Sequence, residues 1–164
     1  MSVGTKRIQL NKSLFAITAI MALYILFYLL KINGYMDISG KYGIERIVCE
    51  QIHDNELLLI DGEQKTVWGM TETHVPGECI EFKFKSARFF SKVDIDSPDG
   101  KKVPVKLSVS SDANEWRDIQ ATMKEDAERA TYIFDRKEQG QYLRIAYMAE
   151  EEGHWPISEV VFHE

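Results

Sequence analysis

Apolar and polar side chains alternate with a period of two from residue 80 onward. Ile80, Phe82 and Phe84 alternate with charged residues, and residues 103–109 repeat the pattern. Because successive side chains of a β-strand point to opposite faces, this period is typical of strands with one buried face. Shorter apolar runs of strand length lie at residues 44–52, 93–95, 132–134, 143–147 and 160–162. The chain is therefore predicted to fold mainly into antiparallel strands.

Turn signals separate these runs and limit the fold further. They are Ser97-Pro98-Asp99-Gly100, Asp112-Ala113-Asn114 and Gln139-Gly140. Gly accepts a positive φ, Pro fixes φ, and Asp or Asn hydrogen-bonds to its own backbone, so each signal favours a turn. Residues 121–130 fit either a helix or a charged loop. About seven short strands without a long helix predict an all-β domain, a β-sandwich or jelly roll of about 120 residues.

The composition is that of one globular domain with a core of ordinary size. Of the 164 residues, 45% are apolar and 28% are charged. The formal charge is −6, but the first twelve residues contain three cations and no acid. The remaining chain has 17 basic and 26 acidic residues, a charge of −9, which argues against nucleic acid as a partner.

Residues 14–30 form a run of seventeen residues without a charge. This length is at the short end of the range for a transmembrane helix. A cleaved signal peptide is the alternative, but its apolar core would be shorter, and no small-residue cleavage site follows Leu30. We therefore expect a transmembrane signal anchor at residues 13–32, after a cytoplasmic basic segment at residues 1–12.

The charges beside this run set its orientation. Three cations precede it, and only Lys31 follows it closely. The positive-inside rule then places the N-terminus in the cytoplasm and everything after Lys31 outside it. A linker at residues 33–43 would lead to a folded domain at residues 44–164. The expected location is the cell membrane, as a single-pass protein with an extracytoplasmic domain.

Little in the sequence points to catalysis, and no enzyme is expected. The four histidines lack metal-ligand spacing, and neither a G-x-S-x-G elbow nor a phosphate-binding glycine loop is present. Asp94 and Asp96 share one side of a strand, where such carboxylates are ordinarily solvated. Cys49 and Cys79 are the only cysteines. An extracytoplasmic location permits a disulfide between them, and two buried thiols are the alternative.

Residues 60–68 combine a carboxylate, a glycine turn, a hydroxyl and a large aromatic ring. Asp61 and Thr66 can turn oxygens inward while Gly62 lets the backbone fold tightly, and calcium binds about six to eight oxygens of this kind. An Asp-Gly turn followed by a core Trp68 is the alternative. The residues alone leave both interpretations open.

Five landmarks in a fixed order connect the sequence to a known family. They are Ile60-Asp61-Gly62 with Thr66-Val67-Trp68, then Gly77-Glu78-Cys79-Ile80-Glu81-Phe82, then Ser110-Ser111-Asp112-Ala113-Asn114-Glu115-Trp116, then Gln141-Tyr142-Leu143-Arg144-Ile145, and Trp155-Pro156-Ile157-Ser158-Glu159-Val160. Together they resemble the discoidin family, which includes the coagulation-factor type C domains and many galactose-binding-like carbohydrate-binding modules. The resemblance covers roughly residues 44–164, and the set rather than any single landmark carries it.

The resemblance implies a jelly-roll β-sandwich whose loops at one end bind a ligand, commonly a terminal sugar. Many members of the family also hold a structural Ca²⁺ ion. In this sequence the ion would be held by the side chains of Asp61 and Glu159, by the hydroxyl or carbonyl of Thr66, and by backbone carbonyls near Leu58, Glu63 and Ser158. Glu63 and Lys65 depart from the usual Asp or Asn, and Lys65 brings a positive charge beside the site. Without an ion, Asp61 would cap its own turn and Glu159 would pair with a nearby cation.

The same resemblance places ligand-binding groups in loops at residues 70–76, 87–91 and 150–155. Sugar recognition needs an aromatic face and polar side chains for the hydroxyl groups. The candidates of these types are His74, Arg88, Phe90 and His154. Each also has a plainer role, as a solvated loop histidine, a core phenylalanine or an arginine that balances the acidic surface. The three tryptophans are assigned to the core or its rim.

Two functions fit these observations. The first is a membrane-anchored extracytoplasmic binding module that recognises carbohydrate, such as a cell-surface or cell-wall glycan. The second is an accessory subunit of a membrane complex, in which the sandwich docks a neighbouring membrane protein and the helix packs against it. Ala16, Ala19 and Ala22 supply small residues at helix-packing intervals for the second function.

Overall fold

The computed structural model describes Met21 and residues 42–49, 55–71, 73–98, 100 and 102–164. The chain divides into two units, Met1–Ile38 and Ser39–Glu164, and the elements below belong to the second. Apart from Met21, the predicted anchor at residues 13–32 lies outside the described residues. Within the described part of the chain, no helix is long and apolar enough to cross a membrane.

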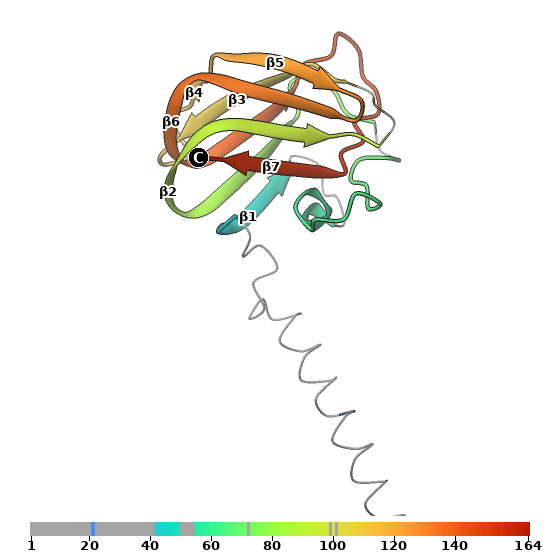
Figure 1. Cartoon of the computed structure of the whole chain (residues 1–164), viewed down its shortest axis with the longest axis horizontal. Coiled ribbons are helices and arrows are strands. Elements are labelled where there is room, and N and C mark those ends of the chain that lie inside the picture. Colours follow the sequence, from blue (N-terminus) through green and yellow to red (C-terminus); the bar gives the residue numbers. More distant parts are fainter. Residues whose placement is uncertain (1–20, 22–41, 50–54, 72, 99, 101) are drawn as a thin grey trace, which may run out of the picture. The chain divides into compact units, whose positions relative to one another are not determined.

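Seven strands and one short 3₁₀ helix form the described part of the second unit (Figure 1). In chain order they are β1 (Ile44–Cys49), η1 (Glu56–Leu59), β2 (Cys79–Asp96), β3 (Val105–Ser110), β4 (Arg117–Asp118), β5 (Ala121–Asp126), β6 (Arg129–Tyr147) and β7 (Glu159–His163). The named strands pair only in the antiparallel sense. The predicted all-β sandwich is confirmed.

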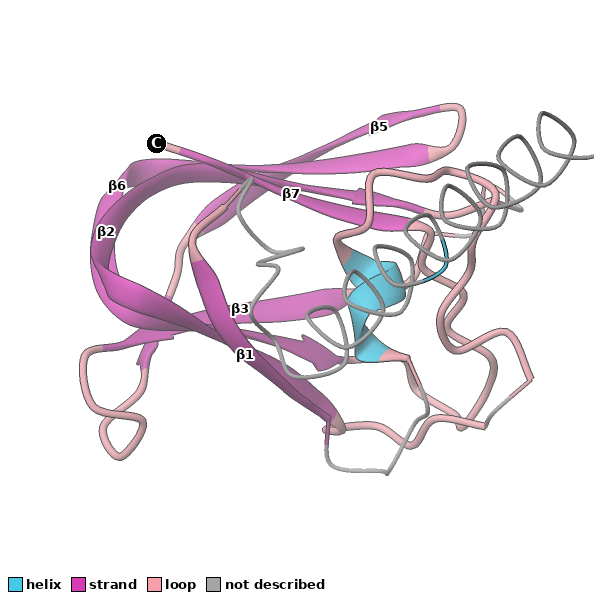
Figure 2. Ribbon diagram, turned by 90° about the horizontal axis from the view of Figure 1, so that it is seen from below, coloured by secondary structure: helices cyan, strands magenta, loops and turns pink. Residues whose placement is uncertain are grey.

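Two long strands, β2 and β6, run through both layers of the sandwich. They pair from Cys79 opposite Ala146 to Asp96 opposite Arg129, with register shifts where the strands bend. One layer has the order β1-β2-β6-β3-β4, and in the other β7 pairs with the second half of β2 and β5 with the first half of β6. Figure 2 shows both long strands curving over at one end, while η1 and several long loops lie at the other.

The structure differs from the sequence prediction in the division of the strands. The runs at residues 80–84 and 93–95 belong to the single strand β2, and those at 132–134 and 143–147 belong to β6. Residues 121–126, predicted as helix or charged loop, are strand β5, and all six are exposed. A strand exposed on both faces has no apolar alternation, so periodicity gives no signal for it.

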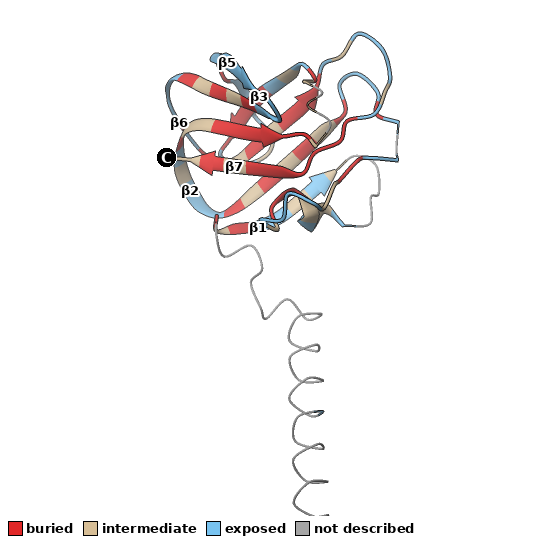
Figure 3. Ribbon diagram, turned by 45° about the vertical axis from the view of Figure 1, so that its right-hand side comes forward, coloured by how far each residue is buried: buried red, intermediate tan, exposed pale blue. Residues whose placement is uncertain are grey.

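The core lies between the two layers, where the buried inner faces meet (Figure 3). Phe82, Phe84 and Phe90 of β2 pack against Phe162 of β7 with ring centroids between 4.9 and 6.3 Å apart. Edge-on pairs at such distances add about 0.5–1.5 kcal/mol each beyond their burial. Two of the tryptophans, Trp68 and Trp155, are core residues, whereas Trp116 is half-buried at the rim. The assignment of the tryptophans to the core or its rim is confirmed.

Asp94 and Asp96 lie on the outer face of the second layer, yet they are only 3% and 4% exposed. Arg129 binds both carboxylate oxygens of Asp96 at 2.6 and 2.8 Å, and His163 Nε2 lies 2.9 Å from Asp94 Oδ2. Burial raises the pKa of Asp94, but hydrogen bonds from Thr131 and His163 outweigh it, and the net pKa is lowered. The expectation that these carboxylates are solvated is wrong, because long cationic side chains cover them.

Cys49 and Cys79 are thiols that do not form a disulfide. Cys49 pairs with Ile80, and Cys79 precedes Ile80 on β2, so the two side chains point to opposite faces of the layer. This geometry excludes a disulfide between them. Burial, followed by the nearby carboxylates of Glu56 and Glu78, raises the pKa of Cys49 to about 12, so its thiol stays protonated and unreactive.

Candidate functional site

Loops from several parts of the chain meet at the end of the sandwich opposite the bend of β2 and β6 (Figure 2). We call this region the loop end; its described residues are 55–71, 73–78, 97–98, 126–129 and 148–158. Isolated bridges join Trp68 to Ile157 and His74 to Gly153, so the two longest loops are held side by side. The loop end therefore has a fixed backbone on which side chains can form a site.

The predicted calcium loop is tied to the start of β7. Asp61 Oδ1 accepts a hydrogen bond from the Glu63 backbone N–H at 2.8 Å, and its Oδ2 lies 2.7 Å from Thr66 Oγ1. The Gly62 backbone N–H donates to Glu159 Oε2 at 2.9 Å, across 97 residues of sequence. The structure thus brings Asp61, Thr66 and Glu159 together, and we call this group the clasp.

The donor chemistry of the clasp fits Ca²⁺. Two carboxylates, the Thr66 hydroxyl and the Glu63 carbonyl, which lies 2.7 Å from that hydroxyl, are hard oxygen ligands of the kind calcium takes. Lys65 is exposed, so its charge is in solvent. No three His, Cys, Asp or Glu side chains of the described residues converge as a metal cluster. An ion here would therefore also need the Thr66 hydroxyl and backbone carbonyl oxygens. Such carbonyls are predicted near Leu58 and Ser158.

His74 lies beneath the loop end and has no exposed surface. Its ring packs against Trp68 and Trp155, with centroids 5.1 and 5.9 Å away, and Nδ1 lies 3.1 Å from Glu78 Oε1. The backbone of His74 exchanges two hydrogen bonds with Gly153. In this structure His74 is buried and supports the loops from inside the domain.

Arg88 and Phe90 lie at the opposite end of the sandwich, in the bend of β2. The Arg88 guanidinium donates to the Tyr42 carbonyl and, at 2.7 Å, to Glu164, so it fastens the two ends of the second unit together. Phe90 is fully buried, with its ring 5.1 Å from that of Phe84. Their segment was predicted as a ligand loop, but β2 continues through it. The four ligand candidates are therefore not brought together.

Of these candidates, His154 alone is exposed at the loop end. It follows Glu150, Glu151 and Glu152, which are also exposed. The Trp155 that comes next is 2% exposed and belongs to the core. The loop at residues 150–155 thus presents acidic and imidazole side chains to solvent, while its aromatic ring faces inward.

A polar pocket of about 200 Å³ opens at the loop end. Its lining residues are Gln64, Asp96, Asp126, Glu128, Arg129 and Ser158. The planar Arg129 guanidinium is fixed by its two bonds to the buried Asp96 carboxylate. Asp126 and Glu128 flank the turn between β5 and β6 and are exposed. Three carboxylates surround one cation, so the pocket has a net negative charge.

Sequence reasoning missed this pocket. Its residues come from the clasp loop, the end of β2, the β5–β6 turn and the residue before β7. No single segment carries a motif. The available signal was the order of the strands: in antiparallel pairing, the end of β2, the start of β6 and the start of β7 meet at one edge.

Comparison with known families gives one match over most of the chain: the F5/8 type C domain, at residues 48–161. A comparison with curated protein sequences gives no match.

Solved structures share the fold. CpGH89CBM32-6, produced by Clostridium perfringens, has 18% identity and a TM-score of 0.60 over 77% of this chain and 98% of that one. The CBM32 of AlyQ, in complex with 4,5-unsaturated mannuronic acid, has 20% identity and a TM-score of 0.61 over 75% and 97%. CpGH89CBM32-5 from Clostridium perfringens, in complex with GalNAc-beta-1,3-galactose, has 15% identity and a TM-score of 0.59 over 73% and 94%. At these identities, the likeness establishes the fold.

Proposed function

Because the chain belongs to the F5/8 type C domain family, we propose that its sandwich is a carbohydrate-binding module and that the polar pocket of the loop end takes the sugar. The observation that carries this proposal is the pocket lining of planar carboxylate, amide and guanidinium groups. Such groups form paired hydrogen bonds with neighbouring hydroxyls. Two solved structures of the same fold, one in complex with 4,5-unsaturated mannuronic acid and one with GalNAc-beta-1,3-galactose, support carbohydrate in general as the class of ligand.

The size and charge of the pocket narrow the class of sugar. A volume of about 200 Å³ is below the ~300–1,000 Å³ of pockets for drug-sized ligands, so it suits one terminal sugar unit. Asp96, Asp126 and Glu128 outnumber Arg129, so a uronic or sialic acid would be repelled. We expect a neutral sugar.

The binding prediction is tested with the full chain, purified in detergent, on a glycan array and then by calorimetry. Glu128→Gln replaces a carboxylate of the pocket rim by an amide, which removes its charge and one of its two acceptor oxygens, and Gln64→Ala removes a hydrogen-bonding amide; both side chains are exposed and lie outside the core. We expect either change to weaken binding of the best sugar by about tenfold, the usual worth of one hydrogen bond to an uncharged ligand.

The matched control is Glu115→Gln, in the exposed loop between β3 and β4 at the far end of the sandwich, which should bind as the wild type does. The proposal fails if no neutral glycan binds, or if the control weakens binding as much as the pocket variants.

We also propose that residues 13–32 anchor the chain in the cell membrane with the sandwich on the extracytoplasmic side. The uncharged run and the cations before it support this orientation. The linker at residues 33–43 spans at most about 40 Å, so the ligand would be close to the membrane. In intact cells, added protease should remove the sandwich and leave the N-terminal segment protected. Complete protection of the sandwich would contradict this orientation.

The clasp leads to a prediction about calcium. We propose that Ca²⁺ binds Asp61, Thr66, Glu159 and neighbouring carbonyls as a structural ion. At a concentration about 100 times its dissociation constant, the ion would add about 2.7 kcal/mol of stability and raise the melting temperature by several degrees. A chelator should reverse the shift, and Glu159→Gln should abolish it while Asp135→Asn, an exposed acid on β6, should keep it. An unchanged melting temperature in the wild type would remove calcium from the proposal.

A further inference from the structure

The two open sides of the sandwich are covered differently. On one side η1 contacts both β1 and β7, and its Leu59 is completely buried in the core. On the other side β3 and the short β4 end one layer and β5 ends the other. In the part of the chain that the structure describes, no helix covers this second side. It instead holds a pocket of about 340 Å³.

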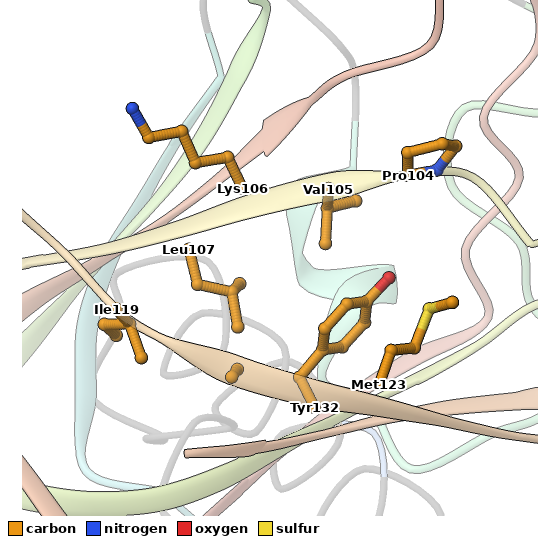
Figure 4. A pocket seen from close by; sticks show the side chains of 8 residues that line it. Pro104, Val105, Lys106, Leu107, Ile119, Met123 and Tyr132 are labelled. Carbon is orange, nitrogen blue, oxygen red and sulfur yellow. The ribbon is translucent and has the colours of Figure 1, made fainter. Parts of the chain in front are cut away.

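This side pocket is mostly apolar and reaches between the layers (Figure 4). Its lining residues are Pro104, Val105, Lys106, Leu107, Ile119, Ala121, Met123 and Tyr132. Met123 is 43% exposed although it lies on the inner face of β5, opposite the buried Tyr132. Burial, followed by the charge of Glu125, raises the pKa of Tyr132 to about 12, so its ring stays neutral. The pocket therefore suits an uncharged apolar group.

The strand that borders the pocket has a free edge. Among the described residues β5 pairs with β6 alone, so its alternate N–H and C=O groups point away from the sheet on the pocket side. Charged residues usually protect such edges, but Ala121, Thr122 and Met123 form an uncharged half beside the pocket. An occupant that satisfies both features has a backbone in extended conformation and an apolar side chain.

We propose that the β5 edge and the side pocket together bind an extended segment of a partner protein, which adds a strand to the sheet and places an apolar side chain in the pocket. Met123 faces inward, as its pairing with the buried Tyr132 shows. In an added strand, the residue opposite Met123 points to the same face of the sheet and therefore enters the pocket. This site is separate from the sugar pocket of the loop end.

The charged residues of β5 indicate which side chains precede the apolar residue in the partner segment. Lys124 lies on the outer face and Glu125 on the inner face, because they pair with Thr131 and Ala130. A partner strand that is antiparallel, like the other strands of this sheet, would place an acidic residue opposite Lys124 and a basic residue opposite Glu125. Read from its N-terminus, the partner segment is therefore basic, acidic and then apolar.

The test uses a synthetic fluorescent peptide of about nine residues, a usual strand length, with the central order Arg-Glu-Leu between threonines and valines. Its binding to the full chain in detergent is measured by anisotropy. We expect binding that falls about tenfold or more when the peptide leucine is replaced by Asp, and slower hydrogen exchange in β5 when the peptide is bound. Met123→Asp in the protein should have the same effect as the leucine change. Met70→Asp, at the loop end, where Met70 is 55% exposed against 43% for Met123, should have none.

A charge exchange distinguishes sequence-specific strand addition from non-specific binding of the peptide. Lys124→Glu should weaken the binding of the Arg-Glu-Leu peptide to the protein. Replacing the peptide glutamate by lysine should restore the affinity of the peptide for that variant. Sugar binding at the loop end should not change in any β5 variant, so the two proposals fail independently. The strand proposal is wrong if the peptide does not bind, or if its affinity is unaffected by the leucine change or by the charge exchange. It is also wrong if sedimentation shows that the chain instead self-associates through β5 and Met123→Asp removes that dimer.

Discussion

Replacing Gly69 by alanine is expected to lower the free energy of unfolding by about 3 kcal/mol. Gly69 has a φ of +70°, and a Cβ there would lie 2.6 Å from the Trp155 carbonyl oxygen and 2.9 Å from His74 Nε2. The left-handed backbone costs a non-glycine residue about 1–2 kcal/mol. Forcing an atom into a packed contact costs about 1–3 kcal/mol more. Urea denaturation followed by tryptophan fluorescence measures the sum.

Gly77→Ala is the matched control, because Gly77 has a φ of +93° but nothing within 4 Å of the added Cβ. It should cost only the backbone term of about 1–2 kcal/mol. The difference between the two variants isolates the contact of Gly69 with Trp155 and His74. Equal losses would show that the loops yield at Gly69 and that the aromatic packing does not hold them. A larger loss at Gly69 should also weaken sugar binding, since the same loops form the loop end.

Arg129→Met has the second large expected effect, a loss of about 2–3 kcal/mol at neutral pH. The change leaves the Asp96 carboxylate, 4% exposed, without its two charge-assisted bonds, and it removes a cation 3.9 Å from Asp94. Loss of one partner from a buried pair costs about 3–5 kcal/mol. We expect slightly less here, because the Arg129 side chain is 44% exposed and Asp94 keeps His163 and Lys92.

The control is Lys106→Met, whose partner Asp118 is 2.9 Å away but 53% exposed. An exposed pair contributes about 0–1 kcal/mol, so this variant should be nearly as stable as the wild type. Thermal unfolding of both variants gives the comparison. A similar small loss at Arg129 would mean that water reaches Asp96 despite its burial.

The effect of Arg129→Met should also depend on pH. The net pKa of Asp94 is below its ordinary value of 3.8, so its ionised form stabilises the fold above that pH, and this stability is lost as the pH falls through the lower folded value. Once the Asp94 carboxylate is protonated, it no longer interacts favourably with the nearby cation of Arg129. The stability difference between wild type and variant should therefore shrink below about pH 4. A constant difference from about pH 3 to pH 7 would contradict the assigned role of the carboxylates.

The class of fold followed from period-two patterning, but the shape of the strands did not. Ile80, Phe82 and Phe84 indicated a clear inner face. In the bend of β2, however, exposed Phe89 and buried Phe90 are both apolar, so the alternation of apolar and polar residues is broken there. The family resemblance predicted a ligand loop at residues 87–91, and the periodicity did not reveal that the strand continues through them. Strand β5 gave no periodic signal at all, because its stability comes from pairing with β6 and not from burial of its own side chains.

The clasp and the polar pocket of the loop end differ in how far the sequence predicts them. Asp61 and Thr66 are five residues apart and hydrogen-bond directly, so local sequence carried most of that prediction. The pocket joins Gln64, Asp96 and Arg129 through strand register, which sequence order alone did not reveal. His74 had the residue type of a ligand group, but only the packing of the loops over it determines that it is buried.

The two strands that cross both layers have a consequence for folding. Pairing of β2 with β6 begins across 33 residues, at Asp96 and Arg129, and ends across 67 residues, at Cys79 and Ala146. Loop closure over such separations is slow and must precede most of the stabilising contacts. Since each layer contains half of both strands, neither layer can open while the other stays closed. Native-state hydrogen exchange should therefore reveal the core of the sandwich as a single cooperative foldon.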